Sequence, residues 1–169
     1  MCGIVGYVGP RNPIPIIVRG LEKLEYRGYD SSGVACVRNG RFEIHRAVGK
    51  LKNLSAELQK LGELDEKAAG ANGKLQIGLG HTRWATHGRP CEQNAHPHIA
   101  GKICLVHNGI VENYATLREK LSELGCKFSS ETDTEIAAHL INAKYENCGD
   151  FLEAVRQAVA EIRGSYALV

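Results

Sequence analysis

Cys2 is the residue whose type and position predict the most specific chemistry. It directly follows Met1, and removal of that methionine would leave a cysteine whose thiol and α-amino group belong to one residue. An α-amino group has a pKa of about 8, so near neutral pH it can serve as the base for a nucleophilic sulfur. On position alone, a small buried residue that opens a strand is the more common use of such a cysteine. The motifs elsewhere in the chain must decide between these two interpretations.

Histidine and cysteine side chains in the middle of the chain offer a competing chemistry, a metal site. Four of them, from Cys91 to Cys104, follow the pattern Cys-x4-His-x-His-x5-Cys, which does not match the spacing of structural zinc sites. We therefore predict no metal and keep metal binding as an alternative. The residues concerned are His81, His87, Cys91, His96, His98, Cys104 and His107.

Composition excludes several classes of protein. The 169 residues carry a formal charge of +2 and 6% aromatic residues, which argues against a nucleic-acid partner. No apolar run approaches the roughly 18 residues of a membrane span, so we expect no membrane partner. No basic segment followed by an apolar stretch opens the chain, which predicts the cytoplasm and six cysteines kept as free thiols. The length predicts one domain.

Hydrophobic periodicity and turn signals predict the elements that must position these residues. Asn39-Gly40 predicts a hairpin turn, Thr132 with Glu135 a capping box, and Asp150 a helix N-cap. Residues 81–98 have no period and predict a long surface loop. Cys36 and Cys126 fall on predicted strands and are expected in the core. The expected strands are 2–9, the two arms of the hairpin, 75–80, 102–109 and 165–169, and the expected helices are 13–24, 52–62, 113–124, 132–146 and 151–163.

This order of elements predicts an α+β fold, with a mixed or antiparallel sheet covered by helices. The last expected strand reaches the end of the chain at Val169. We therefore expect residues 1–169 to be one domain that lacks its C-terminal part.

Six motifs in order along the chain resemble one family: MCGIVGYVG, YRGYDSSG, HTRWATHG, NAHPH, HNGIVEN and SETDTE. Together they are similar to the glutaminase domain, a class II glutamine amidotransferase, of the glutamine–fructose-6-phosphate aminotransferases (isomerizing), also called glucosamine-6-phosphate synthases. The resemblance extends from residue 2 to the last residue. It implies the four-layer αββα sandwich of the N-terminal-nucleophile hydrolases, in which two antiparallel sheets lie between helical layers.

The resemblance also assigns the catalytic residues. Cys2 would be the nucleophile that attacks the side-chain amide of L-glutamine. Asn108 and Gly109 would form the oxyanion hole through a side-chain NH2 and a backbone N–H. Arg27 would support the surroundings of the nucleophile, since a nearby cation favours a thiolate. The alternative for Asn108 and Gly109 is an ordinary Asn-Gly turn. The alternative for Arg27 is a solvated charge on a loop.

The remaining site residues would hold the substrate. Arg83 would grip the α-carboxylate of glutamine with its planar guanidinium, and Asp133 would bind the α-ammonium group. Asp133 could also help Thr132 to cap the N-terminus of the helix that begins there. Trp84, Thr86 and His87 would belong to a loop that closes over glutamine.

The implied reaction is hydrolysis of glutamine to glutamate and ammonia through a γ-glutamyl thioester, with no cofactor. The ammonia would pass to a sugar-phosphate isomerase domain, absent from these residues, that makes glucosamine 6-phosphate from fructose 6-phosphate. An oligomer could form through that domain. The alternatives are a catalytically inactive binding or scaffold homologue and the His/Cys metal-binding domain.

Overall fold

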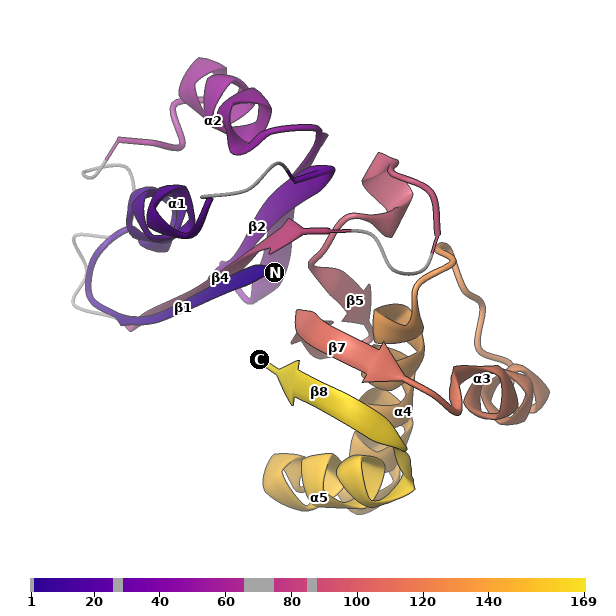
Figure 1. Cartoon of the computed structure of the whole chain (residues 1–169). Coiled ribbons are helices and arrows are strands. Elements are labelled where there is room, and N and C mark those ends of the chain that lie inside the picture. The colour runs from indigo at the N-terminus through magenta and orange to yellow at the C-terminus, as the bar shows by residue number, and fades with distance from the viewer. Residues whose placement is uncertain (1, 26–28, 66–74, 85–87) are drawn as a thin grey trace. The chain divides into compact units, whose positions relative to one another are not determined.

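The computed structural model describes residues 2–25, 29–65, 75–84 and 88–169, and the chain divides into two compact units. Figure 1 shows the helices and strands of both units, each of which has its own hydrophobic core. The elements of the first unit are β1 (Gly3–Gly9), α1 (Pro13–Leu24), β2 (Ser31–Arg38), β3 (Arg41–Val48), α2 (Leu51–Lys60), β4 (Gln76–Arg83) and the short 3-10 helix η1 (Glu92–Asn94). The elements of the second unit are β5 (His98–Ala100), β6 (Ile103–Leu105), β7 (His107–Val111), α3 (Tyr114–Glu123), α4 (Asp133–Cys148), α5 (Phe151–Glu161) and β8 (Gly164–Leu168).

The first unit is built on a four-stranded antiparallel sheet in the order β1-β4-β2-β3. Helices α1 and α2 pack against this sheet and bury their apolar stripes with Val34 and Cys36 of β2. Gly80 of β4 lets α1 approach closely, because a Cβ there would lie 2.4 Å from Cγ2 of Ile17. Strand β4 therefore lies in the interior of the sheet, between β1 and β2 and under α1.

The helix over residues 13–24 and the hairpin turn predicted in the first unit are confirmed. Asn12 caps α1, which was not predicted: its side chain accepts a hydrogen bond from the N–H of Ile14, and prolines occupy the first turn. Asn39 and Gly40 adopt φ angles of 51° and 75°, as a type I′ hairpin turn requires of both central residues. Helix α2 covers most of the range expected for it.

The prediction of a loop over residues 81–98 is wrong at both ends. Strand β4 continues through Arg83, where it pairs with Ser31, and β5 begins at His98. Residues 81–83 have polar side chains on both faces of the strand, so no alternation of polar and apolar residues predicted this part of β4. Pairing with β1 and β2 on both sides satisfies the backbone groups of these residues, and such long-range pairing is invisible to a local pattern.

The second unit contains two antiparallel pairs, β5–β6 and β7–β8, packed with helices α3, α4 and α5. The single strand predicted over 102–109 is wrong, because β6 and β7 are separate strands. Strand β6 turns back onto β5, whereas β7 pairs with β8 from the far end of the chain. Val106, between β6 and β7, is fully buried. One apolar run thus supplies two strands because its two halves have different partners.

Helices α4 and α5 begin at the caps that the sequence predicts. Thr132 accepts a hydrogen bond from the N–H of Glu135, and Asp150 accepts one from the N–H of Glu153. Gly149, at a φ of 70°, ends α4 in the left-handed conformation that glycine favours. Helix α4 extends two residues beyond Glu146, where the prediction ended it. No helix in the described part of the chain is long and apolar enough to cross a membrane.

The two cysteines expected in the core differ in their surroundings. Cys36 is buried on β2, and burial raises the pKa of its thiol to about 11. Cys126 is half-buried and packs against the core of the second unit, but it lies outside any strand, between α3 and α4. The strand prediction at Cys126 is therefore wrong. At neutral pH, Cys36 is an unreactive thiol.

Candidate active site

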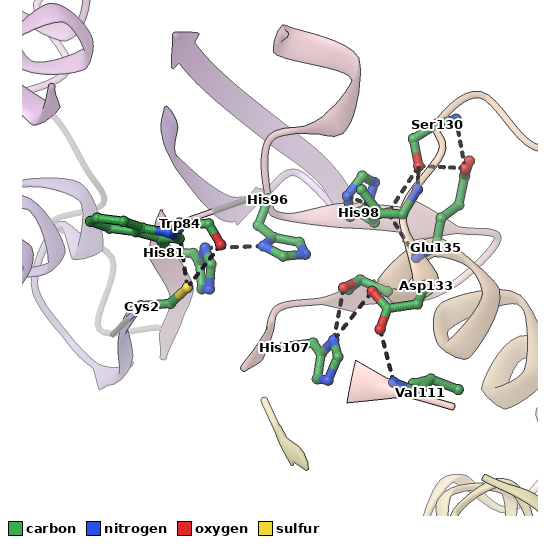
Figure 2. Close-up of polar contacts among 12 residues, drawn as sticks. Cys2, His81, Trp84, His96, His98, His107, Val111, Ser130, Asp133 and Glu135 are labelled. Carbon is green, nitrogen blue, oxygen red and sulfur yellow. Dashed lines mark hydrogen bonds and ion pairs between the residues drawn. The ribbon is translucent and has the colours of Figure 1, made fainter. Parts of the chain in front are cut away.

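The sulfur of Cys2 lies against the backbone of Trp84 in the first unit (Figure 2). The N–H of Trp84 donates to Sγ of Cys2 at 3.1 Å, and the sulfur lies 3.7 Å from the Trp84 carbonyl oxygen. Strand pairing explains this contact. Gly3 pairs with Thr82 at the end of the β1–β4 ladder, so Cys2 and Trp84 are the residues just beyond each strand.

Gly3 and Thr82 fix this end of the ladder. The N–H of Gly3 donates to Oγ1 of Thr82 at 3.0 Å, and Thr82 is fully buried. A Cβ at Gly3 would lie 2.8 Å from the same oxygen, so a larger residue would push the strands apart. The position of the Cys2 sulfur therefore depends on a glycine beside it and on a buried threonine of the neighbouring strand.

Arg83 and Trp84 are neighbours in sequence with opposite exposure. Arg83 is 4% exposed, and its Nη1 lies 3.8 Å from Oδ1 of Asp30, the residue that precedes β2. Trp84 is 53% exposed and does not belong to the core. The role of Trp84 in closing over a substrate remains a prediction, and so does the substrate contact of Arg83.

Two buried histidines, His81 of β4 and His96, contact each other near this end of the strand. Nδ1 of His81 and Nδ1 of His96 are 3.0 Å apart, and their rings meet edge-to-face (Figure 2). One ring nitrogen must donate and the other accept, so both rings cannot carry a proton at both nitrogens while this bond lasts. Two of the histidines weighed as metal ligands in the alternative interpretation are thus used as a hydrogen-bonded pair.

In the second unit, Asn108 and Gly109 lie on β7 and pair with Ala167 and Tyr166 of β8. Gly109 has a φ of 132°, and a Cβ there would lie 2.1 Å from the carbonyl oxygen of Ser165. Only glycine fits this conformation and this spacing. The backbone of Gly109 is exposed and Asn108 is half-buried.

Asp133, the first residue of α4, is held by β7. Its Oδ2 accepts a hydrogen bond from the N–H of Val111 at 2.9 Å, and its Oδ1 lies 3.8 Å from Nδ1 of His107. Nδ1 of His107 also lies 3.0 Å from the hydroxyl of Thr134. Asp133 is 5% exposed, so its carboxylate is a buried charge at a helix N-terminus, where the helix dipole favours an anion.

Glu135 fixes the segment that leads into α4. Its carboxylate accepts hydrogen bonds from the backbone and side chain of Ser129 and of Ser130, at 2.7 to 3.1 Å. Burial opposes ionisation of this group, but the hydrogen bonds from Ser129 and Ser130 outweigh it and hold the pKa of Glu135 below its usual value. The carboxylate thus reaches further back than the cap residue Thr132, the partner that a capping box would give it.

The structure brings the predicted site residues together in two groups. Cys2, Arg83 and Trp84 lie around the end of β4 in the first unit. Asn108, Gly109 and Asp133 lie along β7 and at the start of α4 in the second. The other three, Arg27, Thr86 and His87, lie outside the described residues.

Sequence reasoning missed two partners of the site, Asp30 and His107 in its contact with Asp133. Both stand inside recognised motifs, but only the pairing of strands and the packing of α4 place them beside Arg83 and Asp133. In the described ranges, no group of three or more His, Cys, Asp or Glu side chains could hold a metal ion.

Residues 81–169, more than half of the chain, match the glutamine amidotransferase domain family. The chain belongs to this family. Its sequence is 51% identical over 170 residues to a glutamine–fructose-6-phosphate aminotransferase (isomerizing) of Symbiobacterium thermophilum, and equally similar to the protein of the same name from Clostridium tetani. Each alignment covers 99% of this chain but only 26% of the relative, so the chain spans about a quarter of their length.

A solved structure supports the same conclusion about the fold. The glutamine phosphoribosylpyrophosphate amidotransferase of B. subtilis is similar over 99% of this chain and 34% of its own, with a TM-score of 0.71 and 25% identity. This similarity and the antiparallel pairing of both units confirm the expected fold class, α+β of the N-terminal-nucleophile type.

Proposed function

We propose that this chain hydrolyses L-glutamine to glutamate and ammonia, with Cys2 as the nucleophile. The observation that carries the proposal is the placement of the Cys2 sulfur at the open end of the β1–β4 ladder, with the N–H of Trp84 donating to it. An N–H aimed at sulfur stabilises the negative charge that the sulfur carries when it attacks. Family membership supplies the substrate class.

In the proposed mechanism, the α-amino group of Cys2, freed by removal of Met1, takes the thiol proton as Sγ bonds to the side-chain carbonyl carbon of glutamine. Asn108 and Gly109 donate hydrogen bonds to the oxyanion that develops. The ammonium formed on Cys2 returns its proton to the leaving nitrogen as the C–N bond breaks, which releases ammonia and leaves a thioester. Water then attacks the thioester, the amine accepts a proton from that water, and glutamate leaves as the thiol is restored.

Arg83 and Asp133 would hold the two charged groups of the substrate. A guanidinium offers two parallel N–H donors to the α-carboxylate, and a carboxylate attracts the α-ammonium group. Arg27, Thr86, His87 and Trp84 keep the supporting and closing roles that the family resemblance implies. Because these contacts persist from substrate to transition state, they would set affinity more than rate.

We also propose that residues 1–169 form the larger part of an amidotransferase domain in a longer protein. In that protein, a sugar-phosphate isomerase domain would use the ammonia to make glucosamine 6-phosphate from fructose 6-phosphate. The support is the activity for which relatives that are 51% identical and about four times as long are named. A reducing compartment such as the cytoplasm suits a reaction that needs Cys2 as a free thiol.

Covalent labelling tests the nucleophile directly. A glutamine analogue with an electrophilic group in place of the amide should modify Cys2, and glutamine should protect against it, as peptide mapping would show. Cys36 is the matched control, because a buried thiol with a pKa of about 11 should stay unlabelled until the protein unfolds. Labelling chiefly at Cys91 or Cys36, or turnover that survives Cys2→Ala, would contradict the proposal. No labelling at all would favour the inactive homologue.

The state of the N-terminus gives a second test. If Met1 remains, the nitrogen of Cys2 is an amide and cannot accept a proton near pH 7. An uncleaved N-terminal tag should therefore abolish glutamine hydrolysis, while cleavage that exposes Cys2 should restore it. Intact mass and ammonia release, measured on the same sample, would link the two. Full activity with the tag in place would refute the role of the α-amine.

A further inference from the structure

The guanidinium of Arg83 is a buried cation with a carboxylate beside it. Arg83 is 4% exposed, and its Nη1 lies 3.8 Å from Oδ1 of Asp30. A buried charge is costly unless an opposite charge compensates it, and removal of one partner strongly destabilises such a pair. The carboxylate of Asp30 therefore restricts the position of the Arg83 guanidinium. A separation of 3.8 Å is that of an ion pair and is longer than a hydrogen bond.

Asp30 is itself fixed through its backbone and its side chain. Its N–H donates to the carbonyl oxygen of Arg83 at 3.0 Å, which extends the β2–β4 ladder by one step. Its own carbonyl accepts a hydrogen bond from the N–H of Gly49 at 2.7 Å. Its Oδ1 accepts a hydrogen bond from the hydroxyl of Ser31, a fully buried residue, at 2.9 Å. The carboxylate is thus a rigid reference point beside the arginine side chain.

A rigid carboxylate at this distance can orient a guanidinium without binding it in a short hydrogen bond. Arginine recognises a carboxylate best when its planar group presents two parallel N–H donors, so its orientation decides its affinity. An arginine side chain also has many rotamers, and holding it in one of them before the ligand arrives reduces the entropy lost on binding.

We propose that Asp30 is a positioning residue that orients Arg83 to receive the α-carboxylate of the substrate. This inference rests on the proposed function, in which Arg83 contacts that carboxylate. Asp30 would act through Arg83 and would not itself touch the reacting atoms. Its effect should therefore fall on affinity for ligands that carry an α-carboxylate, and the chemical step should be nearly unchanged.

Asp30→Asn is the sharpest test, since it removes the charge but keeps the shape and an oxygen that can accept from Ser31. We expect KM for glutamine to rise about tenfold and kcat to stay within about threefold of wild type. L-glutamine α-amide has no α-carboxylate, so its kcat/KM should be the same in the variant and in wild type. A merely structural role would lower kcat/KM for both substrates.

Glu63→Gln is the matched control in the same unit. Glu63 pairs with Arg38 through two hydrogen bonds of 2.5 and 2.9 Å, so the control breaks a stronger carboxylate–arginine pair away from Cys2. It should leave KM for glutamine unchanged. In a double-mutant cycle, Asp30→Asn should have little further effect once Arg83 is lysine.

Two further measurements keep the test decisive. If Asp30→Asn fails to fold, Ser31→Ala keeps the charge but frees the carboxylate, and KM should rise about threefold. The dissociation constant of L-glutamate, measured by calorimetry, reports on Arg83 without any turnover and should rise by the same factor as KM in each variant. If wild type binds glutamate but releases no ammonia, the proposed function fails, but the glutamate affinities of wild type and variants still test the role of Asp30. Unchanged KM and glutamate affinity in Asp30→Asn, or equal losses for glutamine and its α-amide, would overturn the inference.

Discussion

The two units hold their charged site residues in different ways. In the first unit, the cation of Arg83 lies at ion-pair distance from one carboxylate, on a strand paired on both sides. In the second, the anion of Asp133 accepts a short hydrogen bond from the N–H of Val111 at the start of a 16-residue helix. A backbone N–H can stabilise an anion, and the second unit uses that of Val111 for Asp133. In the first unit, the carboxylate of Asp30 is the opposite charge beside the cation of Arg83.

The two units also differ in what they would do for the reaction. The first unit contains Cys2, proposed as the nucleophile, and the second contains the Asn-Gly pair proposed for the oxyanion hole. If this division is correct, variants in the second unit that remove an oxyanion donor should reduce rate, and variants of Arg83 should reduce affinity.

Asn108→Ala should have the largest effect, because it removes a donor aimed at charge that develops only during the reaction. Loss of one such donor typically costs about 10²–10³ in kcat, and KM for glutamine should change little. Asn113→Ala is the matched control in the same unit. Asn113 exchanges hydrogen bonds with the backbone of Glu161 and Arg163, so its loss should lower thermal stability and leave kcat intact. A raised KM with normal kcat in Asn108→Ala would assign this residue to binding.

Arg83→Lys should raise KM for glutamine about 30-fold while kcat is largely kept, because a point charge replaces a planar pair of donors. Steady-state kinetics over a wide range of glutamine concentration would separate the two parameters. Arg38→Lys supplies the control, since Arg38 also pairs with a carboxylate in the first unit but lies on β2 at the hairpin. If Arg83→Lys instead lost kcat while Asn108→Ala kept it, the roles given to the two units would be reversed.

Glu135→Gln should lower the free energy of unfolding by about 1.5 kcal/mol at neutral pH, because the hydrogen bonds from Ser129 and Ser130 lose a charged acceptor. The folded state lowers the pKa of Glu135, so its contribution is fully present above the unfolded value of about 4.3 and is lost as pH falls through the folded value. Wild type should therefore lose stability below about pH 4.3 more steeply than the variant.

Denaturant unfolding of both proteins between neutral pH and acid would measure this difference. Glu161→Gln is the control, because Glu161 also has a lowered pKa, caused first by its hydrogen bond with Lys120, but lies nearer the surface. Surface ion pairs contribute little, so the control should lose less than about 1 kcal/mol. Parallel acid profiles for Glu135→Gln and wild type would contradict the role given to this carboxylate.

Local signals predicted much of the fold correctly. Thr132 and Asp150 cap their helices as expected, and Asn39-Gly40 forms the hairpin turn. In each case, the hydrogen bond or the dihedral angle involves residues only a few positions apart. Such interactions are set by neighbours in sequence and need no knowledge of the rest of the molecule.

The prediction of strands from the sequence was wrong at the segments whose strand partners are distant in the sequence. Residues 81–83 form a strand only because β1 and β2 lie on either side, and one apolar run was divided between β6 and β7 by two different partners. A hydrogen-bond ladder between strands about 80 positions apart in sequence leaves no local period. The sequence of the polar end of β4 therefore predicts a loop, although these residues form a strand.

The types and order of the residues were enough to identify the chemistry: a cysteine at position 2, the ordered motifs of a glutamine amidotransferase, and the side chains expected to bind a zwitterion. The groups that hold those side chains in place became visible only in the folded chain. Asp30 meets Arg83, and His107 meets Asp133, across separate strands and helices. The type of a side chain fixes its charge and donors, but its orientation depends on neighbours that folding brings from far along the chain.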